Sequence, residues 1–439
     1  MKKIKKLIKN PKKSLFKIAI PIMVGMIVQT MYNVVDTAFV GHLGKDYLAA
    51  LTYTFPLFFL FLSFSLGINV GLNSYISRKL GGSNKEEAER GIFQAFIIIF
   101  LTSFLLLLIS FFFMKNFFIM IGAKGNSLRL AIDYFSIFIF AIFVMFFSGI
   151  FNTIFSSQGN TKITMKIQVS MLFLNMFLDY IFIYVYNFGI KGAAYATLIS
   201  VISSLILFIF NFKKSIIKFK IVKLNKKIFK EILIVGIPAS FQMFLFSFYV
   251  LFLNVFFSNY GVEYVAVLGI VSRLESVAIL PVIAISQAIL TLIGMIYGAK
   301  KYNLLNELSN YTIRITFLIS FFIGLLFFIF PEYIIRIFTS DSNMILLSKN
   351  YLRIIVFSYP FISLSIIYSR ILQAIGHGIS ALVNPLFRTI LIVVPFSYII
   401  VYILNYNYLF IALVIVIASI IASIIGFLLK NYHIKKLNS

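Results

Sequence analysis

Long apolar stretches alternate with short polar turns along the whole chain, as in residues 92–114 and 310–330. Each stretch is about as long as the roughly 20 residues that an α-helix needs to cross a bilayer. Hydropathy and helix-breaking residues predict twelve such spans, at 15–40, 48–77, 90–114, 128–153, 161–186, 191–212, 230–259, 264–294, 310–330, 347–372, 379–403 and 408–430. The pattern therefore predicts an all-α polytopic membrane protein.

The composition agrees with this class. The 439 residues are 61% hydrophobic and 12% charged, whereas soluble domains are about half apolar and a quarter charged. The chain contains no cysteine, so disulfides are excluded. The first apolar stretch is long enough to span and lacks a small-residue cleavage site, so we expect a retained helix and not a cleaved signal peptide.

The second half of the chain repeats the first at a constant offset. The segments "IAIPIMVGMIVQTMYNVV" and "VGIPASFQMFLFSFYVLF" place Pro21 and Pro238 in register. The same offset pairs Tyr32 with Tyr249, Gly44 with Gly261, Gly81 with Gly298, and Gly159 with Gly376. Each half then contains six spans, and an even-numbered repeat keeps its orientation. We expect two six-helix lobes related by a pseudo-twofold axis along the membrane normal, which is a transporter architecture.

The net charge of +26 at pH 7 is concentrated beside the spans, in residues 1–17, 213–230 and 430–436. Basic clusters in such places set orientation and contact anionic lipid, so we expect membrane lipid as a partner and no nucleic acid. If the N-terminus is inside, Lys and Arg on that side outnumber those on the other side by roughly four to one. Both termini are therefore expected to be cytoplasmic.

These observations divide the chain into an N-terminal lobe, residues 1–212, and a C-terminal lobe, residues 231–439, joined by a basic linker, residues 213–230, on the cytoplasmic side. The mixed Lys, Ile and Phe pattern of the linker predicts a helix that lies on the inner membrane surface.

Three carboxylates fall within spans: Asp36, Asp179 and Glu275. Intramembrane carboxylates face protein or water and tend to mark ion or proton paths. Two structural alternatives stay open. In the first, Asp36 or the deeper Asp179 only extends its side chain to the outer membrane interface. In the second, Glu275 forms an ion pair with Arg273, two residues earlier, or a helix cap.

Two polar stripes accompany the first pair of carboxylates, because residues three or four apart share a helix face. The stripe of the first span contains Gln29, Tyr32, Asn33 and Asp36, and that of the fifth span contains Gln168, Asn175 and Asp179. Both carboxylates lie roughly 6–10 Å below the outer boundary, so we expect them to line one chamber. The repeat places Leu253 and Phe396 at the equivalent positions, and this asymmetry favours a functional role over a requirement of the fold.

Other features are less specific. Pro21 and Pro238 either occupy permitted first-turn positions of their helices or allow the first span to bend. The three histidines, His42, His377 and His433, lie near loops without metal-ligand spacing. No phosphate loop, CxxC pair or nucleophile–base motif is present, so we do not expect an enzyme. Some of the 53 Phe and 24 Tyr residues would suit flat organic cations.

Together these segments resemble the multidrug and toxic compound extrusion (MATE) family. The resemblance rests on twelve spans in two lobes, the "P…Q..YN..D…VG.lG" first helix, the "LGINVGLNSYISRKLGG" second helix and "QG" at Gln158, and it covers essentially the whole chain. The chain is most similar to the DinF-type branch, because both carboxylates fall in the first lobe. The NorM-type branch also relies on acidic groups in spans seven and ten, where this chain has none mid-span.

The resemblance implies roles for individual residues. Asp36 would be the coupling carboxylate, with Gln29 and Tyr32 beside it, and Asn33 and Gln168 would also line the cavity. The coupling cluster would be completed by Asn152, Asn175, Asp179 and Thr197. A sodium ion, if used, would bind at Asp36, Asn175, Asp179 and Thr197. Pro21 would be the kinking proline.

The implied activity is secondary active antiport, in which amphipathic, often cationic organic compounds leave the cell in exchange for H⁺ or Na⁺ by alternating access of the two lobes. We expect a monomer in a bacterial or archaeal cell membrane, with no cofactor besides the coupling ion. The alternative is a lipid-linked precursor flippase of the same wider superfamily. A membrane enzyme lacks the clustered His and Asp residues it would need, and a scaffold or receptor does not account for the intramembrane carboxylates.

Overall fold

The computed structural model describes residues 1–438, apart from the side chains of Asn33 and Asn438. Within these residues all regular structure is helical. The helices are α1 (Lys2–Lys9), α2 (Pro11–Gly41), α3 (Lys45–Gly81), α4 (Lys85–Met120), α5 (Gly125–Ser157), α6 (Thr161–Asp179), η1 (Tyr180–Val185), α7 (Gly189–Phe212), α8 (Lys226–Ser258), α9 (Val262–Gly298), α10 (Tyr302–Ile329), α11 (Pro331–Ile335), α12 (Ser342–Ile355), η2 (Val356–Ser358), α13 (Tyr359–Ala374), α14 (Gly378–Leu386), η3 (Phe387–Val393), α15 (Val394–Tyr398), η4 (Ile399–Ile403) and α16 (Leu409–Asn438).

Twelve helical stretches are long and apolar enough to span a membrane, which confirms the predicted number. Nine of them are single α-helices. The fifth span joins α6 to the π-helix η1, the tenth joins α12, η2 and α13, and the eleventh joins α14, η3, α15 and η4. Helices satisfy all their backbone hydrogen bonds within one segment, and this is why they are favoured where no water is available.

Short polar side chains fix where several helices begin. Asn84 accepts a hydrogen bond from the backbone N–H of Glu87 at 3.1 Å and caps α4, and Asp341 accepts one from Met344 at 2.9 Å and caps α12. Asn225 caps α8 in the same way. Such caps satisfy donors that the first helical turn leaves unpaired.

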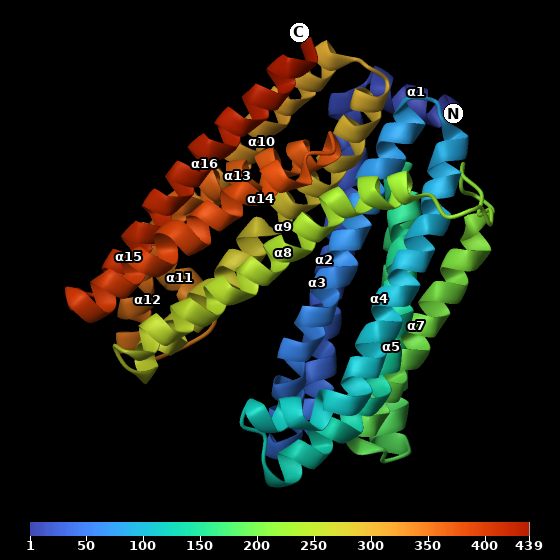
Figure 1. Ribbon diagram of the computed structural model, residues 1–439. Helices are drawn as coiled ribbons and strands as arrows, with labels where there is room; N and C mark the ends of the chain where they lie inside the picture. The colour runs from blue at the N-terminus through green and yellow to red at the C-terminus, as the bar shows by residue number, and fades with distance from the viewer. Residues whose placement is uncertain (439) are drawn as a thin grey trace.

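The spans form two bundles, α2–α7 and α8–α16, that meet at one end and diverge toward the other, so that Figure 1 shows a V. Both chain termini lie at the end where the bundles meet, which we call the terminal face; the other end is the opposite face. The contacts between the lobes fall in the terminal-face halves of their helices. Ser74 donates to the carbonyl oxygen of Gln373 at 2.6 Å, and Thr291 donates to Asn73 at 3.0 Å.

Glycines bring the two lobes into backbone contact at the terminal face. A Cβ atom at Gly71 would collide with the carbonyl oxygen of Ile232 in α8, and one at Gly81 would collide with that of Met295 in α9. Small residues allow helix axes to approach closely in a membrane. The lobes are therefore joined by backbone-to-backbone packing at one end only.

The repeat is visible in the fold as equivalent contacts. Asn126 donates to the carboxylate of Asp46 at 3.0 Å, and Asn343 donates to that of Glu263 at 2.9 Å at the equivalent positions of the second half. Gly44 and Gly261 precede α3 and α9 with φ of 124° and 130°, a conformation that favours glycine. The two turns are thus built alike, as expected for six-helix lobes related by pseudo-twofold symmetry.

The linker between the lobes is not the surface helix that its sequence predicts. Residues 213–225 contain no regular helix, and α8 begins at Lys226. Buried polar side chains of the first lobe bind the linker backbone instead: Gln158 accepts from Ile216 at 2.7 Å, Glu89 from Lys218 at 2.9 Å, and Gln94 from Asn225 at 3.3 Å. These bonds replace the hydrogen bonds that a helix would have made within itself.

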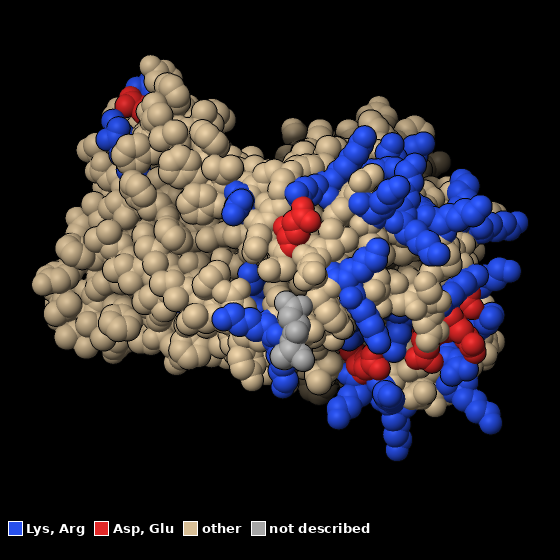
Figure 2. Space-filling view, turned by 90° about the horizontal axis from the view of Figure 1, so that it is seen from above, with Lys and Arg blue, Asp and Glu red and all other residues tan. Residues whose placement is uncertain are grey.

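The terminal face is basic. Figure 2 looks onto this face and shows Lys and Arg side chains crowded over one side of it, with little charge on the rest. Lys220 forms an ion pair with Glu89 at 3.0 Å, and Lys12 of the first span contacts Glu307 of the second lobe. Basic residues outnumber acidic ones in the chain as a whole, with 39 Lys and Arg against 13 Asp and Glu.

Candidate functional site

Three helices of the first lobe bring together the residues that the sequence predicts to act jointly. Asp36 comes from α2, Asn175 and Asp179 come from α6, and Thr197 comes from α7. The side chains of Asn175, Asp179 and Thr197 are fully buried. Asn175 and Asp179 are one helical turn apart and therefore share a face of α6. We call Asp36, Asn175, Asp179 and Thr197 the polar cluster.

Tyr32 connects two of these helices. Its hydroxyl lies 2.9 Å from that of Thr197, in a buried hydrogen bond between α2 and α7. Tyr32 precedes Asp36 by one turn, so the bond fixes the face of α2 that presents the carboxylate to α6. Tyr32 thus has a positioning role in the geometry of the cluster.

The carboxylates of Asp36 and Asp179 lie within electrostatic range of each other. Among the described residues, neither carboxylate has a Lys or Arg ion-pair partner. Both oxygens of Asp179, Oδ1 of Asp36 and both polar atoms of the Asn175 amide are buried with no hydrogen-bond partner among the side chains and backbone that the structure describes. Two buried like charges repel each other in a medium of low dielectric constant, so this pair favours uptake of a proton or a metal cation.

The chemistry of the donor set fits a small hard cation as well as a proton. Carboxylate, amide carbonyl and hydroxyl oxygens are ligands that alkali and alkaline-earth cations accept. Asp36, Asn175, Asp179 and Thr197 supply all three kinds. Directly after Asp179 the helix changes to the π-helix η1, a local widening that is frequent at functional sites.

The interface alternative does not hold for Asp179, whose side chain is fully buried. The first-turn interpretation of the prolines is also wrong. Pro21 and Pro238 lie well inside α2 and α8, and both helices continue through them. An interior proline removes one backbone hydrogen bond and weakens the helix against bending, so the bending interpretation remains as the prediction.

The other predicted residues lie around the cluster or away from it. Gln168 packs with its amide oxygen against Gly25 of α2, and Gln29 is exposed. The side chain of Asn33 lies outside the part of the chain that the structure describes. Asn152 accepts a weak hydrogen bond from Ser156, 3.4 Å away and one turn later on α5, and the carbonyl of Ser156 faces Thr291 of the second lobe. Asn152 is thus placed beside the contact between the lobes.

Tyr134 of α5 was not predicted and belongs with the site. It is buried and lies within electrostatic range of Asp36, Asp179 and Tyr32. The only signal in the sequence was an aromatic hydroxyl within an apolar span, which many lipid-facing tyrosines share. Ser200, also buried, lies one turn after Thr197 on the same face of α7.

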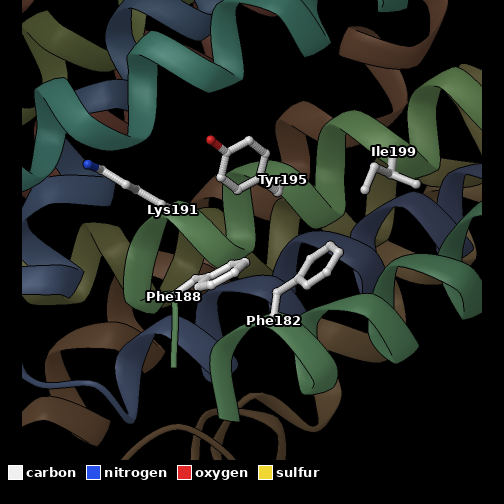
Figure 3. A pocket seen from close by; sticks show the side chains of 5 residues that line it. All are labelled: Phe182, Phe188, Lys191, Tyr195 and Ile199. Carbon is white, nitrogen blue, oxygen red and sulfur yellow. The ribbon is translucent and has the colours of Figure 1, made fainter. Parts of the chain in front are cut away.

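An aromatic cavity of about 600 Å³ lies on the other side of α7. Figure 3 shows the rings of Phe182 and Phe188 side by side below that of Tyr195, with Lys191 at the edge. Tyr195 and Thr197 are two residues apart and so project from opposite sides of α7. The cavity therefore does not open onto the polar cluster.

The second lobe has a charged group of its own, and the alternative of an ion pair between Glu275 and Arg273 does not hold. Glu275 does not pair with Arg273, whose side chain is exposed; it interacts electrostatically with Arg388 of η3. Arg388 in turn lies over the ring of Tyr249, 5.1 Å from its centroid. The signal that could have found Arg388 is an arginine in the middle of an apolar span, since intramembrane charges of either sign are costly.

Twelve spanning helices, two pseudosymmetric lobes and a carboxylate pair within the spans define a polytopic membrane transporter. A model of the MatE family matches residues 21–181 and 238–399, so that the two matched segments begin at the equivalent prolines Pro21 and Pro238. The chain belongs to the MATE family.

Named relatives and a solved structure are similar to this chain over most of its length. The probable multidrug resistance protein YoeA of Bacillus subtilis is 25% identical over 395 residues, which cover 87% of this chain and 85% of that protein. The multidrug export protein MepA of Staphylococcus aureus is 25% identical over 391 residues, with the same shares covered. A structure of a MATE multidrug resistance transporter of the MOP superfamily in its outward-facing conformation is 29% identical, has a TM-score of 0.93, and is matched over 100% of this chain and 99% of that chain.

Proposed function

We propose that the protein is a secondary active antiporter that exports amphipathic, often cationic organic compounds in exchange for H⁺ or Na⁺. One observation supports this above all: the fully buried Asp179 and the half-buried Asp36 form a carboxylate pair without a basic partner among the described residues. Such a pair takes up a cation when the cation is available and repels itself when it is not. Relatives named as multidrug export proteins support the substrate class.

The ion would act on the packing of α2 against α6 and α7. When a proton or Na⁺ neutralises the pair, Asp36 and Asp179 can approach, and α2 packs onto α6 with Tyr32 bound to Thr197. When the ion leaves, repulsion between the carboxylates favours separation of the helices. A ligand shifts such an equilibrium only through its different affinity for the two states, and the carboxylate pair supplies that difference. Pro21 gives α2 a point at which to bend.

Alternating access would use the two ends of the V. In this structure, the contacts between the lobes lie at the terminal face, as Ser74–Gln373 and Asn73–Thr291 show. If the basic terminal face is cytoplasmic, as the distribution of Lys and Arg predicts, this structure is open to the outside. The likeness to a transporter in the outward-facing conformation supports this assignment. Return to the inward-open state would break these contacts and form others at the opposite face.

Further parts of the proposal follow from the sequence. We assign the chain to the DinF-type branch, because spans seven and ten contain no acidic residue mid-span. We propose a monomer in a bacterial or archaeal cell membrane, with anionic lipid bound at the basic terminal face. The units are a lobe at residues 1–212, a linker at 213–230 and a lobe at 231–439. No observation on the chain favours a lipid-linked precursor flippase.

The test is ion-driven efflux of ethidium from proteoliposomes with the pH gradient and the Na⁺ gradient imposed separately. We expect the wild type to respond to one of them, and Asp36→Asn and Asp179→Asn each to lose about tenfold or more of the driven rate. Asp46→Asn is the matched control, because its side chain can still accept the bond from Asn126. Driven efflux at the wild-type rate by both cluster variants would remove the carboxylate pair from coupling.

A further inference from the structure

Three side chains form a charged group inside the second lobe: Glu275 of α9, Arg388 of η3 and Tyr249 of α8. Tyr249 is the repeat counterpart of Tyr32, the tyrosine beside the polar cluster of the first lobe. The equivalent tyrosine thus stands beside a carboxylate pair in one lobe and beside an arginine and a glutamate in the other. The two lobes offer different chemistry at related positions.

The charges of Glu275 and Arg388 interact, yet the two groups form no direct ion pair in the part of the chain that is described. The guanidinium of Arg388 lies over the ring of Tyr249 instead, 5.1 Å from the centroid. Nε of Arg388 and the hydroxyl of Tyr359 are buried with no hydrogen-bond partner among the residues described. Opposite charges held apart in a low-dielectric interior are stabilised by a group of matching polarity between them.

An aromatic groove lies on two of the elements that carry this group, α8 and span eleven. It lies between α8 and span eleven, has a volume of about 500 Å³, and is lined by Phe252, Phe256, Pro395, Tyr398 and Tyr402 among others. Phe252 is three residues beyond Tyr249, and Phe256 is one turn further on the same face of α8. The flat, apolar lining suits an aromatic body, and helical spacing places Phe252 and Phe256 on the face of α8 that carries Tyr249.

We propose that Glu275, Arg388 and Tyr249 bind the zwitterionic head of an amphipathic substrate, its carboxylate on Arg388 and its ammonium on Glu275. Nε of Arg388 donates to the carboxylate, and the aromatic groove holds the apolar body. This inference rests on the proposed export function and names a substrate class for it. It also separates the roles of the lobes: the carboxylate pair of the first lobe binds the coupling ion, and the second lobe selects by charge pattern.

The experiment uses three fluorescent probes with the same aromatic body and measures their binding to the purified full chain in maltoside detergent by fluorescence anisotropy. Nε-dansyl-lysine has a free α-ammonium and α-carboxylate, its methyl ester lacks the anion, and its Nα-acetyl derivative lacks the cation. We expect the zwitterion to bind at least about tenfold more tightly than either derivative, because each loses one charge-assisted contact.

Variants assign each charge to its residue. Arg388→Gln should abolish the preference for the zwitterion over the methyl ester, and Glu275→Gln should abolish the preference over the acetyl derivative. Arg388→Lys keeps the charge and should keep part of the first preference. Arg353→Gln is the matched control, since this exposed arginine also lies over a ring, that of Phe328, but outside the group.

Equal binding of the three probes by the wild type would overturn the inference, as would preferences that survive both glutamine variants. Phosphatidylethanolamine added to the micelles distinguishes the other source of a zwitterion: competition with dansyl-lysine would show that a lipid headgroup is the ligand and would overturn the assignment to a carboxylate. Binding here needs no ion gradient. Failure of driven efflux would therefore count against the proposed function and leave this binding measurement unaffected. Loss of the preference for the zwitterion would count against this inference and leave the proposed function unaffected.

Discussion

The hydroxyl of Tyr32 lies 2.9 Å from the hydroxyl of Thr197, and this single bond joins the first span to the sixth beside the buried carboxylates. Tyr32 is 7% exposed and Thr197 is fully buried, so water does not replace the bond easily. The bond therefore holds α2 against the helices that present Asn175 and Asp179. Its energy can be measured separately from the charge of the carboxylates.

We predict that Tyr32→Phe lowers the free energy of unfolding by about 1 kcal/mol, the usual value of one buried hydrogen bond. Thr197→Val should do the same, and the double variant should cost less than the sum because both remove one interaction. Thermal unfolding in detergent measures this cycle. Tyr333→Phe, at a tyrosine that is 77% exposed, serves as the control. Additive losses would show that the two hydroxyls do not depend on each other.

Disrupting the backbone contact between Gly81 and Met295 should shift the equilibrium between the conformations of the two lobes. In Gly81→Ala, the new Cβ meets the Met295 carbonyl and weakens the joint at the terminal face. The population in which the lobes approach at the opposite face should rise several-fold, as a penalty of about 1 kcal/mol implies. The chain has no native cysteine, so spin labels at Lys45→Cys and Val262→Cys, at equivalent ends of α3 and α9, report that distance.

Gly269→Ala is the matched control for this shift. Gly269 lies on α9, and a Cβ atom at that position would point into open space. It should leave the distance distribution unchanged. A distribution for Gly81→Ala identical to that of the wild type would mean that this contact does not bias the equilibrium.

The linker should become accessible to protease when Glu89 is neutralised. Glu89 is 3% exposed, accepts the backbone N–H of Lys218 at 2.9 Å and pairs with Lys220 at 3.0 Å. Glu89→Gln leaves a buried amide in place of an ion pair, so residues 213–225 should detach more often. We expect trypsin to cleave in this segment several-fold faster, as local opening governs cleavage. Glu86→Gln, at an exposed carboxylate of the same helix, should cleave at the wild-type rate.

The contacts of Glu332, which lies outside the spans, should make the stability of the protein depend on pH. Hydrogen bonds from Arg336 at 2.9 Å and Lys349 at 3.3 Å lower the pKa of Glu332 from its ordinary value. Because the folded-state pKa is lowered, this stabilisation is present above the ordinary pKa of glutamate, about 4.3, and is lost as the pH falls through the folded-state value.

Glu332→Gln should therefore reduce the fall in melting temperature between about pH 6 and about pH 3.5. Thermal unfolding at both pH values measures the difference. Glu263→Gln is the control, because a glutamine can keep the bond with Asn343. The effect is small because the Glu332 side chain is 41% exposed. A slope equal to that of the wild type would show that the three groups do not interact in solution.

The sequence by itself determined the twelve spans, the repeat and the polar stripes. A helix in a bilayer satisfies its backbone within one segment, so its position depends on local hydropathy alone. Which residues share a face also depends only on helical periodicity, so Tyr32 and Asp36, and Asn175 and Asp179, could be grouped without a structure. The constant offset between the two halves is a property of the chain, and the equivalent turns at Asp46 and Glu263 follow from it.

Only the tertiary structure decided which faces meet. Tyr134 joins the polar cluster, and Glu275 interacts with Arg388 and not with its sequence neighbour Arg273, because residues far apart in the chain are brought together by packing between helices. The linker, a helix by its pattern, is irregular because buried side chains of the first lobe bind its backbone. Local patterns determine the helices of this protein. Which side chains contact one another, including the separated charges of the second lobe, depends on packing between distant segments that no local pattern encodes.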